Sequence, residues 1–190
     1  MHPVADLIRP ALGKPCWLAR HGHGSFVTME FGEPQVEIGE PKLRRVYIED
    51  APERSLQRLA FVRGDWHLWI YCCRWSLTLD GTVLARDQSD DITMNRALAV
   101  LNGQILTAAT IEPGSLTRFC FDLGCILTTY PAPPGIYENE PVEQWKWYTG
   151  TGPVLLMRGD GSYSVSGPHE KPDDHQWLPI TALVHVEDAG

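Results

Sequence analysis

The sequence is poor in the features that mark membrane, secreted or metal-stabilised proteins. No uninterrupted apolar run is long enough to span a bilayer, and the N-terminus lacks the basic start and apolar core of a secretion signal. The five cysteines are odd in number and form no C-x-x-C pair, so they indicate neither a disulfide framework nor a zinc site. We therefore expect reduced cysteines, a cytoplasmic location and no contact with a membrane.

Basic residues are also scarce. The 190 residues include 16 Lys and Arg against 24 Asp and Glu, which gives a formal net charge of −8. Because neutralisation of phosphates supplies most non-specific affinity for nucleic acids, this balance argues against a nucleic-acid partner. Hydrophobic residues make up 43% and charged residues 21% of the chain, a composition typical of a folded domain rather than of a disordered chain.

What the sequence does contain is an internal repeat at an offset of ninety residues. Residues of the first half that recur at this offset in the second half include these pairs: Gly13 and Gly103, Gly24 and Gly114, Ser25 and Ser115, Phe31 and Phe121. Beyond an insertion the similarity resumes at a shorter offset, where Trp75 corresponds to Trp147. We therefore predict a single domain over residues 1–190 that consists of two repeat halves. The halves cover about residues 4–92 and 94–167, with an insertion at 39–64 and a tail at 168–190.

Each half is predicted to be a short helix followed by antiparallel strands. Apolar residues three and four positions apart indicate helices at residues 4–11 and 97–101. Gly13 and Gly103 end them at the position where a left-handed cap is favoured. The dipeptides Asp80-Gly81 and Asp160-Gly161 lie between extended runs and indicate hairpin turns. The predicted fold class is α+β, mainly β: two tandem units of a small helix plus antiparallel strands, packed with pseudo-twofold symmetry around a shared core.

Two further predictions concern the insertion and the tryptophans. Residues 52–60 have a helix-like composition, so we predict that a helix decorates the first half there. The tryptophans form clusters in both halves: Trp66, Trp69 and Trp75, then Trp145 and Trp147. We interpret these clusters as core packing, with a stacking platform for a sugar or base as the alternative.

The pattern His21-x-His23, followed by Glu30, is the first candidate site. Alternate residues of a strand point the same way, so two imidazoles and a carboxylate on one side could hold a metal. The pattern resembles the start of a cupin metal motif, in which the Glu lies closer to the second His. The glycines at positions 22 and 24 favour a turn instead. His21, His23 and Glu30 are therefore weak candidates for a ligand site, and no metal is predicted.

Asp65 and His67 are the second candidate. In an extended strand both side chains lie on one face together with Cys73, which is the arrangement that an acid–base pair requires. A polar strand end is the alternative interpretation. The sequence contains no G-x-S-x-G elbow, phosphate loop or dinucleotide fingerprint, so we predict no catalytic residue and no cofactor.

A pattern of glycines, aromatics and turn pairs runs through both halves. Its clearest stretches are Gly-Ser-Leu-x-x-Phe-x-Phe-Asp-Leu-Gly124, Arg-Gly-Asp-Gly161-Ser-Tyr and Trp66-His-Leu-Trp-Ile-Tyr-Cys-Cys. This pattern resembles an uncharacterised bacterial protein family of unknown function. The resemblance implies the fold and no catalytic residue. Some small acidic proteins of this general kind serve as immunity or accessory partners of bacterial toxins.

Taken as a whole, the sequence predicts a bacterial, cytoplasmic, non-enzymatic protein that binds a protein partner or forms a homo-oligomer. An acidic surface would set the rate of encounter with a basic partner, and a few buried aromatics would set the affinity. The alternative is a small-molecule or metal-dependent enzyme that uses the His21/His23 loop or His67.

Overall fold

The computed structural model describes residues 2–24, 26–48, 51–133, 142–167, 170–171 and 174–187. Strands make up 50% of the chain and helices 12%, with two α-helices among the described residues. This composition confirms the predicted mainly-β class. No helix in these ranges has the length and apolar character needed to cross a bilayer.

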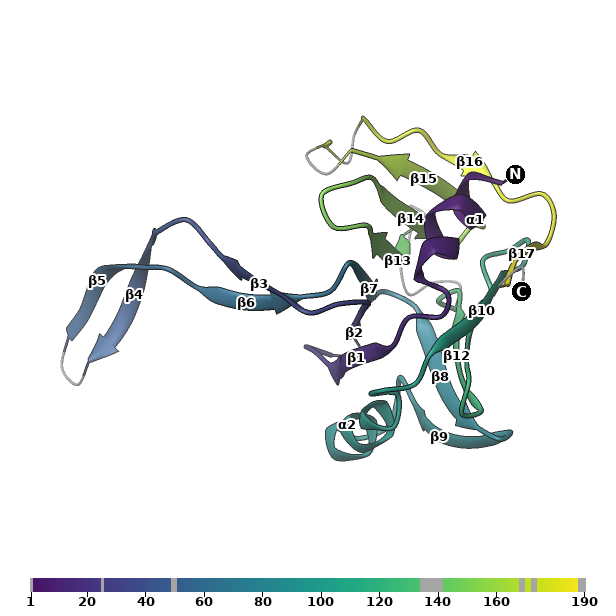
Figure 1. The fold of residues 1–190 in the computed structure, drawn as a ribbon, viewed down its shortest axis with the longest axis horizontal. Helices are drawn as coiled ribbons and strands as arrows, with labels where there is room; N and C mark the ends of the chain where they lie inside the picture. The colour runs from purple at the N-terminus through teal and green to yellow at the C-terminus, as the bar shows by residue number, and fades with distance from the viewer. Residues whose placement is uncertain are drawn as a thin grey trace.

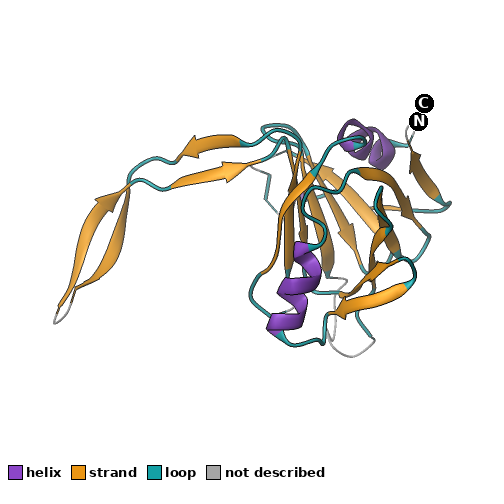
Figure 2. Cartoon of the chain, turned by 60° about the horizontal axis from the view of Figure 1, so that its bottom comes forward, coloured by secondary structure: helices purple, strands orange, loops and turns teal. Residues whose placement is uncertain are grey.

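Two antiparallel sheets form the body of the protein (Figures 1 and 2). The seven-stranded sheet has, in spatial order, β1 (Cys16–His21), β2 (Val27–Phe31), β7 (Trp66–Ile70), β13 (Glu143–Tyr148), β14 (Val154–Arg158), β15 (Ser162–Ser166) and β16 (Leu178–Pro179). The six-stranded sheet has β17 (Val184–Glu187), β10 (Leu106–Ile111), β11 (Thr117–Phe121), β12 (Cys125–Tyr130), β8 (Arg74–Leu79) and β9 (Thr82–Arg86). Strand β8 of the first half of the chain therefore pairs with β12 of the second half, and β13 of the second half pairs with β7 of the first half.

The core lies between the two sheets and is rich in aromatic rings. Trp75, Trp145 and Trp147 are fully buried, which agrees with their interpretation as core residues. Phe119 of β11 meets Trp147 of β13 with ring centroids 6.3 Å apart, and Phe31 of β2 lies 5.2 Å from the same ring. The contact between Phe119 and Trp147 joins the two sheets, whereas Phe31 and Trp147 belong to the same sheet. Large aromatic side chains contribute much of the burial energy of such a core.

Two helices close the sides of the sandwich. Helix α1 (Pro3–Ile8) contacts β17, and helix α2 (Asp91–Ala99) contacts β1 and β9. Asp90 caps α2 by accepting a hydrogen bond from the backbone N–H of Thr93, as sequence preferences for helix starts lead one to expect. Gly13 and Gly103, which follow the two helical segments, have φ of +74° and +90°. Both occupy the left-handed region that favours glycine, as predicted.

A long two-stranded arm extends from the body between β2 and β7 (Figures 1 and 2). Its inner part pairs β3 (Gln35–Ile38) with β6 (Ala60–Arg63), and its outer part pairs β4 (Lys42–Ile48) with β5 (Ala51–Gln57). The arm overlaps the predicted insertion. The prediction of a helix at residues 52–60 is wrong. This segment pairs across strands, β5 with β4 and β6 with β3, and the pairing overrides local helix propensity.

Candidate functional site

Glu30 and His67 lie side by side at the foot of the arm. They are directly paired residues of β2 and β7, and the His67 Nδ1 is 2.7 Å from the Glu30 Oε1. The other carboxylate oxygen of Glu30 accepts a hydrogen bond from the Gly64 N–H at 3.0 Å. Glu30 is only 7% exposed, and a buried carboxylate of this kind needs such partners. It therefore attaches the returning strand of the arm to the body.

Asp65 holds the other strand of the arm. One of its carboxylate oxygens accepts from the Glu33 N–H at 3.0 Å and the other from the Gln35 side-chain amide at 2.9 Å. Asp65 also lines a groove of about 430 Å³ at the foot of the arm. Glu30 and Asp65 thus each bind one of the two chain segments that enter and leave the arm. We call Glu30, Asp65 and His67 the arm base.

His21 and His23 lie elsewhere. His21, the last residue of β1, pairs with Val27, whose side chain faces the core, whereas Glu30 lies on the opposite face of β2. The His21 ring contacts the Gly24 carbonyl oxygen, and His23 is exposed in the following turn. Glu30 is therefore joined to His67 and not to His21 or His23.

The described residues contain no group of three or more His, Cys, Asp or Glu side chains placed to hold a metal. The five cysteines are free. Burial raises the pKa of the Cys16 and Cys73 thiols far above the ordinary value, so neither is a thiolate near neutral pH. Cys73 points into the core and away from the face that carries His67, so it cannot pair with the arm base.

The arm itself carries an uncovered apolar face. In its inner part Val36 pairs with Val62 and Ile38 with Ala60, so all four side chains share one face. Val36 and Ile38 are 70% and 69% exposed, and Val62 is 43% exposed. In the outer part, Leu43 and Leu56 form a further exposed cross-strand pair. We call Val36, Ile38, Ala60 and Val62 the apolar face of the arm.

The opposite face of the inner arm is polar, and its side chains contact one another. The Arg63 Nε lies 3.0 Å from a carboxylate oxygen of Glu37, and the Arg63 guanidinium lies 5.3 Å from the centre of the Phe61 ring. Gln35, on the same face, is bonded to Asp65. The two faces of the arm therefore differ: one has internal partners for its side chains, and the other is apolar and uncovered.

A second cluster lies on the outer face of the seven-stranded sheet. Trp69 and Tyr71 stack with ring centroids 4.7 Å apart, and Phe26 meets both rings edge-on. The Tyr71 hydroxyl donates to Glu143. Burial, together with this hydrogen bond, raises the pKa of Tyr71 above its ordinary value. Since Tyr71 is already stacked and approached by the Lys146 ammonium at 5.6 Å, these rings are engaged by contacts within the chain.

Comparison with known proteins adds no relative. No family model, no curated protein and no solved structure matches the chain.

Sequence reasoning located the arm base but not the apolar face. The alternation of polar and apolar residues in Gln35-Val36-Glu37-Ile38 is the signal that could have found it, because this period predicts a strand with one apolar side. The matching run Phe61-Val62-Arg63 lies in the segment 39–64, which the sequence assigned to an insertion, directly after the predicted helix at 52–60. The outer cluster was missed as well, since Trp69 was interpreted as a core residue and is half-buried on the outer face of the sheet.

Proposed function

We propose that the protein is a non-enzymatic protein-binding module that associates through its arm, and that its partner at this surface is a second copy of the chain. The observation that carries the proposal is the apolar face of the arm, where Val36, Ile38 and Val62 are exposed on a structure held firmly at its base. A two-stranded hairpin is marginally stable alone in water, so covering this face also stabilises the arm.

The charge distribution favours a second copy as the occupant. Residues 35–63 contain 6 of the 16 Lys and Arg and 5 of the 24 Asp and Glu, so the arm has a formal charge of +1 and the remainder −9. Two acidic bodies repel each other. The arms are nearly neutral and extend away from the bodies, so contact through the arms keeps the two negatively charged bodies apart.

Face-to-face packing of two arms satisfies the geometry of a twofold interface. The apolar face is one patch that would meet its own copy, as an isologous contact requires, and two stacked two-stranded sheets form a small sandwich. Four aliphatic side chains from each copy make a small interface, so we expect a dissociation constant in the micromolar range, on the order of 10 μM. The acidic bodies stay free to attract a basic protein partner, as an immunity or accessory protein would.

Sedimentation velocity tests this proposal. The wild type is expected to pass from monomer to dimer between about 1 and 100 μM, whereas a variant with Val36→Thr, Ile38→Thr and Val62→Thr stays monomeric. Threonine keeps the β propensity of these positions, so the arm retains its strands. Added salt is expected to strengthen the dimer by screening the repulsion of the bodies.

The matched control changes exposed apolar residues of the body. A variant with Val165→Thr on β15 and Leu178→Thr on β16 should dimerise as the wild type does. A wild type that remains monomeric at about 100 μM contradicts the proposal, as does a dimer that the three arm substitutions leave intact. A dimer weakened by salt would indicate that the arm docks on an acidic body instead.

The enzyme alternative rests on the pair of His67 and Glu30. A histidine within 2.7 Å of a carboxylate has the form of an acid–base pair, and its side chain is partly exposed. Glu30, however, also binds the Gly64 N–H, which assigns the pair to the arm base. Stoichiometric zinc, iron or manganese in the purified protein would favour the enzyme alternative.

We propose in addition that the body consists of two tandem copies of one unit related by a pseudo-twofold axis. In support, each half, the arm apart, has a helix, then three strands of one sheet, then strands that join the other sheet: β8 and β9 in the first half, and β13, β14 and β15 in the second. In the seven-stranded sheet, β1, β2 and β7 of the first half are followed in space by β13 and β14 of the second half. In the six-stranded sheet, β10, β11 and β12 of the second half are followed by β8 and β9 of the first half. An experimental structure in which β8 and β13 did not change sheets would contradict this origin.

A further inference from the structure

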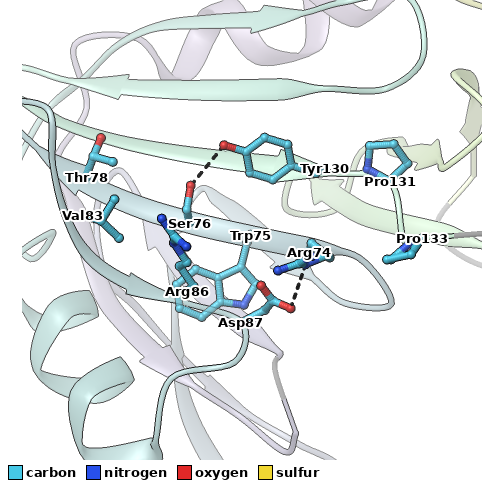
Figure 3. Close-up of a pocket in the computed structure, with 10 residues that line it drawn as sticks. All are labelled: Arg74, Trp75, Ser76, Thr78, Val83, Arg86, Asp87, Tyr130, Pro131 and Pro133. Carbon is cyan, nitrogen blue, oxygen red and sulfur yellow. Dashed lines mark hydrogen bonds and ion pairs between the residues drawn. The ribbon is translucent and has the colours of Figure 1, made fainter. Parts of the chain in front are cut away.

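A pocket of about 470 Å³ lies on the outer face of the six-stranded sheet, away from the arm (Figure 3). It forms where β8, β9 and the end of β12 meet. Trp75 and Leu77 of β8 point into the core, so the alternate residues Arg74, Ser76 and Thr78 face outward and line the pocket. A volume of this size is within the range of small-molecule sites.

Two arginines line the pocket, and the described residues neutralise only one of them. Arg74 is paired with Asp87, with 3.4 Å between its Nε and a carboxylate oxygen. Arg86, which lies opposite Ser76 on β9, has no ion-pair partner in the part of the chain that the structure describes. Its guanidinium is therefore free to bind an anion, and its planar fork of donors matches a carboxylate.

Hydroxyl groups and apolar walls complete the pocket. The Ser76 Oγ and the Tyr130 Oη lie 3.3 Å apart, so the hydroxyl that accepts this bond keeps its own O–H free to donate to a ligand. Val83 is exposed on one side, and Pro131 and Pro133 form another side (Figure 3). A ligand with one anionic end and a compact apolar body would satisfy both kinds of surface.

We propose that this pocket binds a small organic monocarboxylate. The carboxylate pairs with the Arg86 guanidinium and accepts from one hydroxyl of the Ser76–Tyr130 pair, while the apolar part of the ligand contacts Val83 and the prolines. A phosphate monoester fits less well, because its second negative charge has no free cation to meet: Arg74 is already neutralised by Asp87.

Calorimetric titration of the full chain with benzoate tests the proposal. Benzoate should bind at a single site with a dissociation constant on the order of 1 mM, as its size allows. Benzamide, which has the same shape without the charge, should bind at least about tenfold more weakly, and so should phenyl phosphate. Arg86→Gln should weaken benzoate binding by about tenfold or more, since a hydrogen-bonded charge is lost.

The matched control is Arg20→Gln, an exposed arginine on β1 of the other sheet, which should leave benzoate binding unchanged. Thermal unfolding of each variant checks that the fold is retained, and Arg86→Lys should restore binding in part because it returns the charge without the fork. Equal binding of benzamide, tighter binding of phenyl phosphate, or full binding by a folded Arg86→Gln variant would each overturn the assignment.

Discussion

The β8–β9 hairpin and the arm are both antiparallel hairpins with alternating side chains, yet only β8 and β9 have a layer of the protein opposite their apolar side. Trp75 and Leu77 of β8 are buried against the other sheet. Val36 and Ile38 of β3 occupy the same kind of alternating positions and are about 70% exposed. Alternation therefore predicts a strand and an apolar side, but whether that side is covered depends on contacts distant in the sequence.

The two regions also differ in how they are stabilised. The body has a shared aromatic core, whereas the arm depends on its ladder, the Arg63–Glu37 pair and the hydrogen bonds of the arm base. Its stability is thus expected to be lower than that of the body, as is usual for elements with few buried contacts. The following substitutions separate the two.

The largest effect is expected for Trp147→Ala in the core. Trp147 is fully buried between Phe31 and Phe119, so its removal leaves a cavity and should lower the free energy of unfolding by about 3–5 kcal/mol. Urea unfolding followed by circular dichroism measures this. The matched substitution Val36→Ala on the arm, in dilute monomeric protein, should change stability by less than about 0.5 kcal/mol. Similar losses for both would contradict the distinction between core and arm.

An intermediate effect is expected for Glu30→Gln at the arm base. The substitution keeps the size of the side chain but removes the charge from its bonds to Gly64 and His67, which should cost about 1–2 kcal/mol locally. Hydrogen exchange is expected to accelerate at the Gly64 amide and along the arm, and to stay slow at Trp145 in the core. Glu33→Gln, an exposed neighbour, is the control. Equal acceleration at Trp145 would show that Glu30 supports the body rather than the arm.

The outcome of sequence reasoning follows this difference between body and arm. Local rules identified features decided by a few neighbouring residues: the glycines at 13 and 103, and the hairpin turn at Asp80-Gly81, where both residues have positive φ. Helix propensity failed at residues 52–60, because the pairing partners of β5 lie several residues away in β4 and a local window does not include them.

The candidate sites illustrate the same limit. Asp65 and His67 were found because they are near each other in sequence, and the register of β2 and β7 then added Glu30 from 37 residues away. The register of β1 and β2 separated Glu30 from His21, to which spacing alone had joined it. The pocket around Arg86 could not be anticipated, since it depends on β12 lying beside β8 and on Asp87 neutralising Arg74.

The smallest effect is expected from ion pairs, and it also distinguishes body from arm. On the outer face of the body, the Lys146 Nζ lies 2.8 Å from Glu143. Burial raises the pKa of Glu143, but hydrogen bonds from Lys146 and Tyr71 outweigh it and hold the pKa below its ordinary value of 4.5. The folded state therefore favours the carboxylate, and this stabilisation is complete above pH 4.5 and is lost as the pH falls through the folded pKa.

Urea unfolding of the wild type and a Lys146→Met variant between about pH 6 and pH 3 measures this contribution. The difference in the free energy of unfolding should be below about 1 kcal/mol at pH 6 and should shrink as Glu143 is protonated. Arg63→Met removes the matched pair of the arm, which is half-exposed at both ends and screened by solvent, so its effect should be smaller still. A Lys146→Met difference that stays constant with pH would mean that Lys146 acts by packing on Tyr71 and not by holding the charge of Glu143.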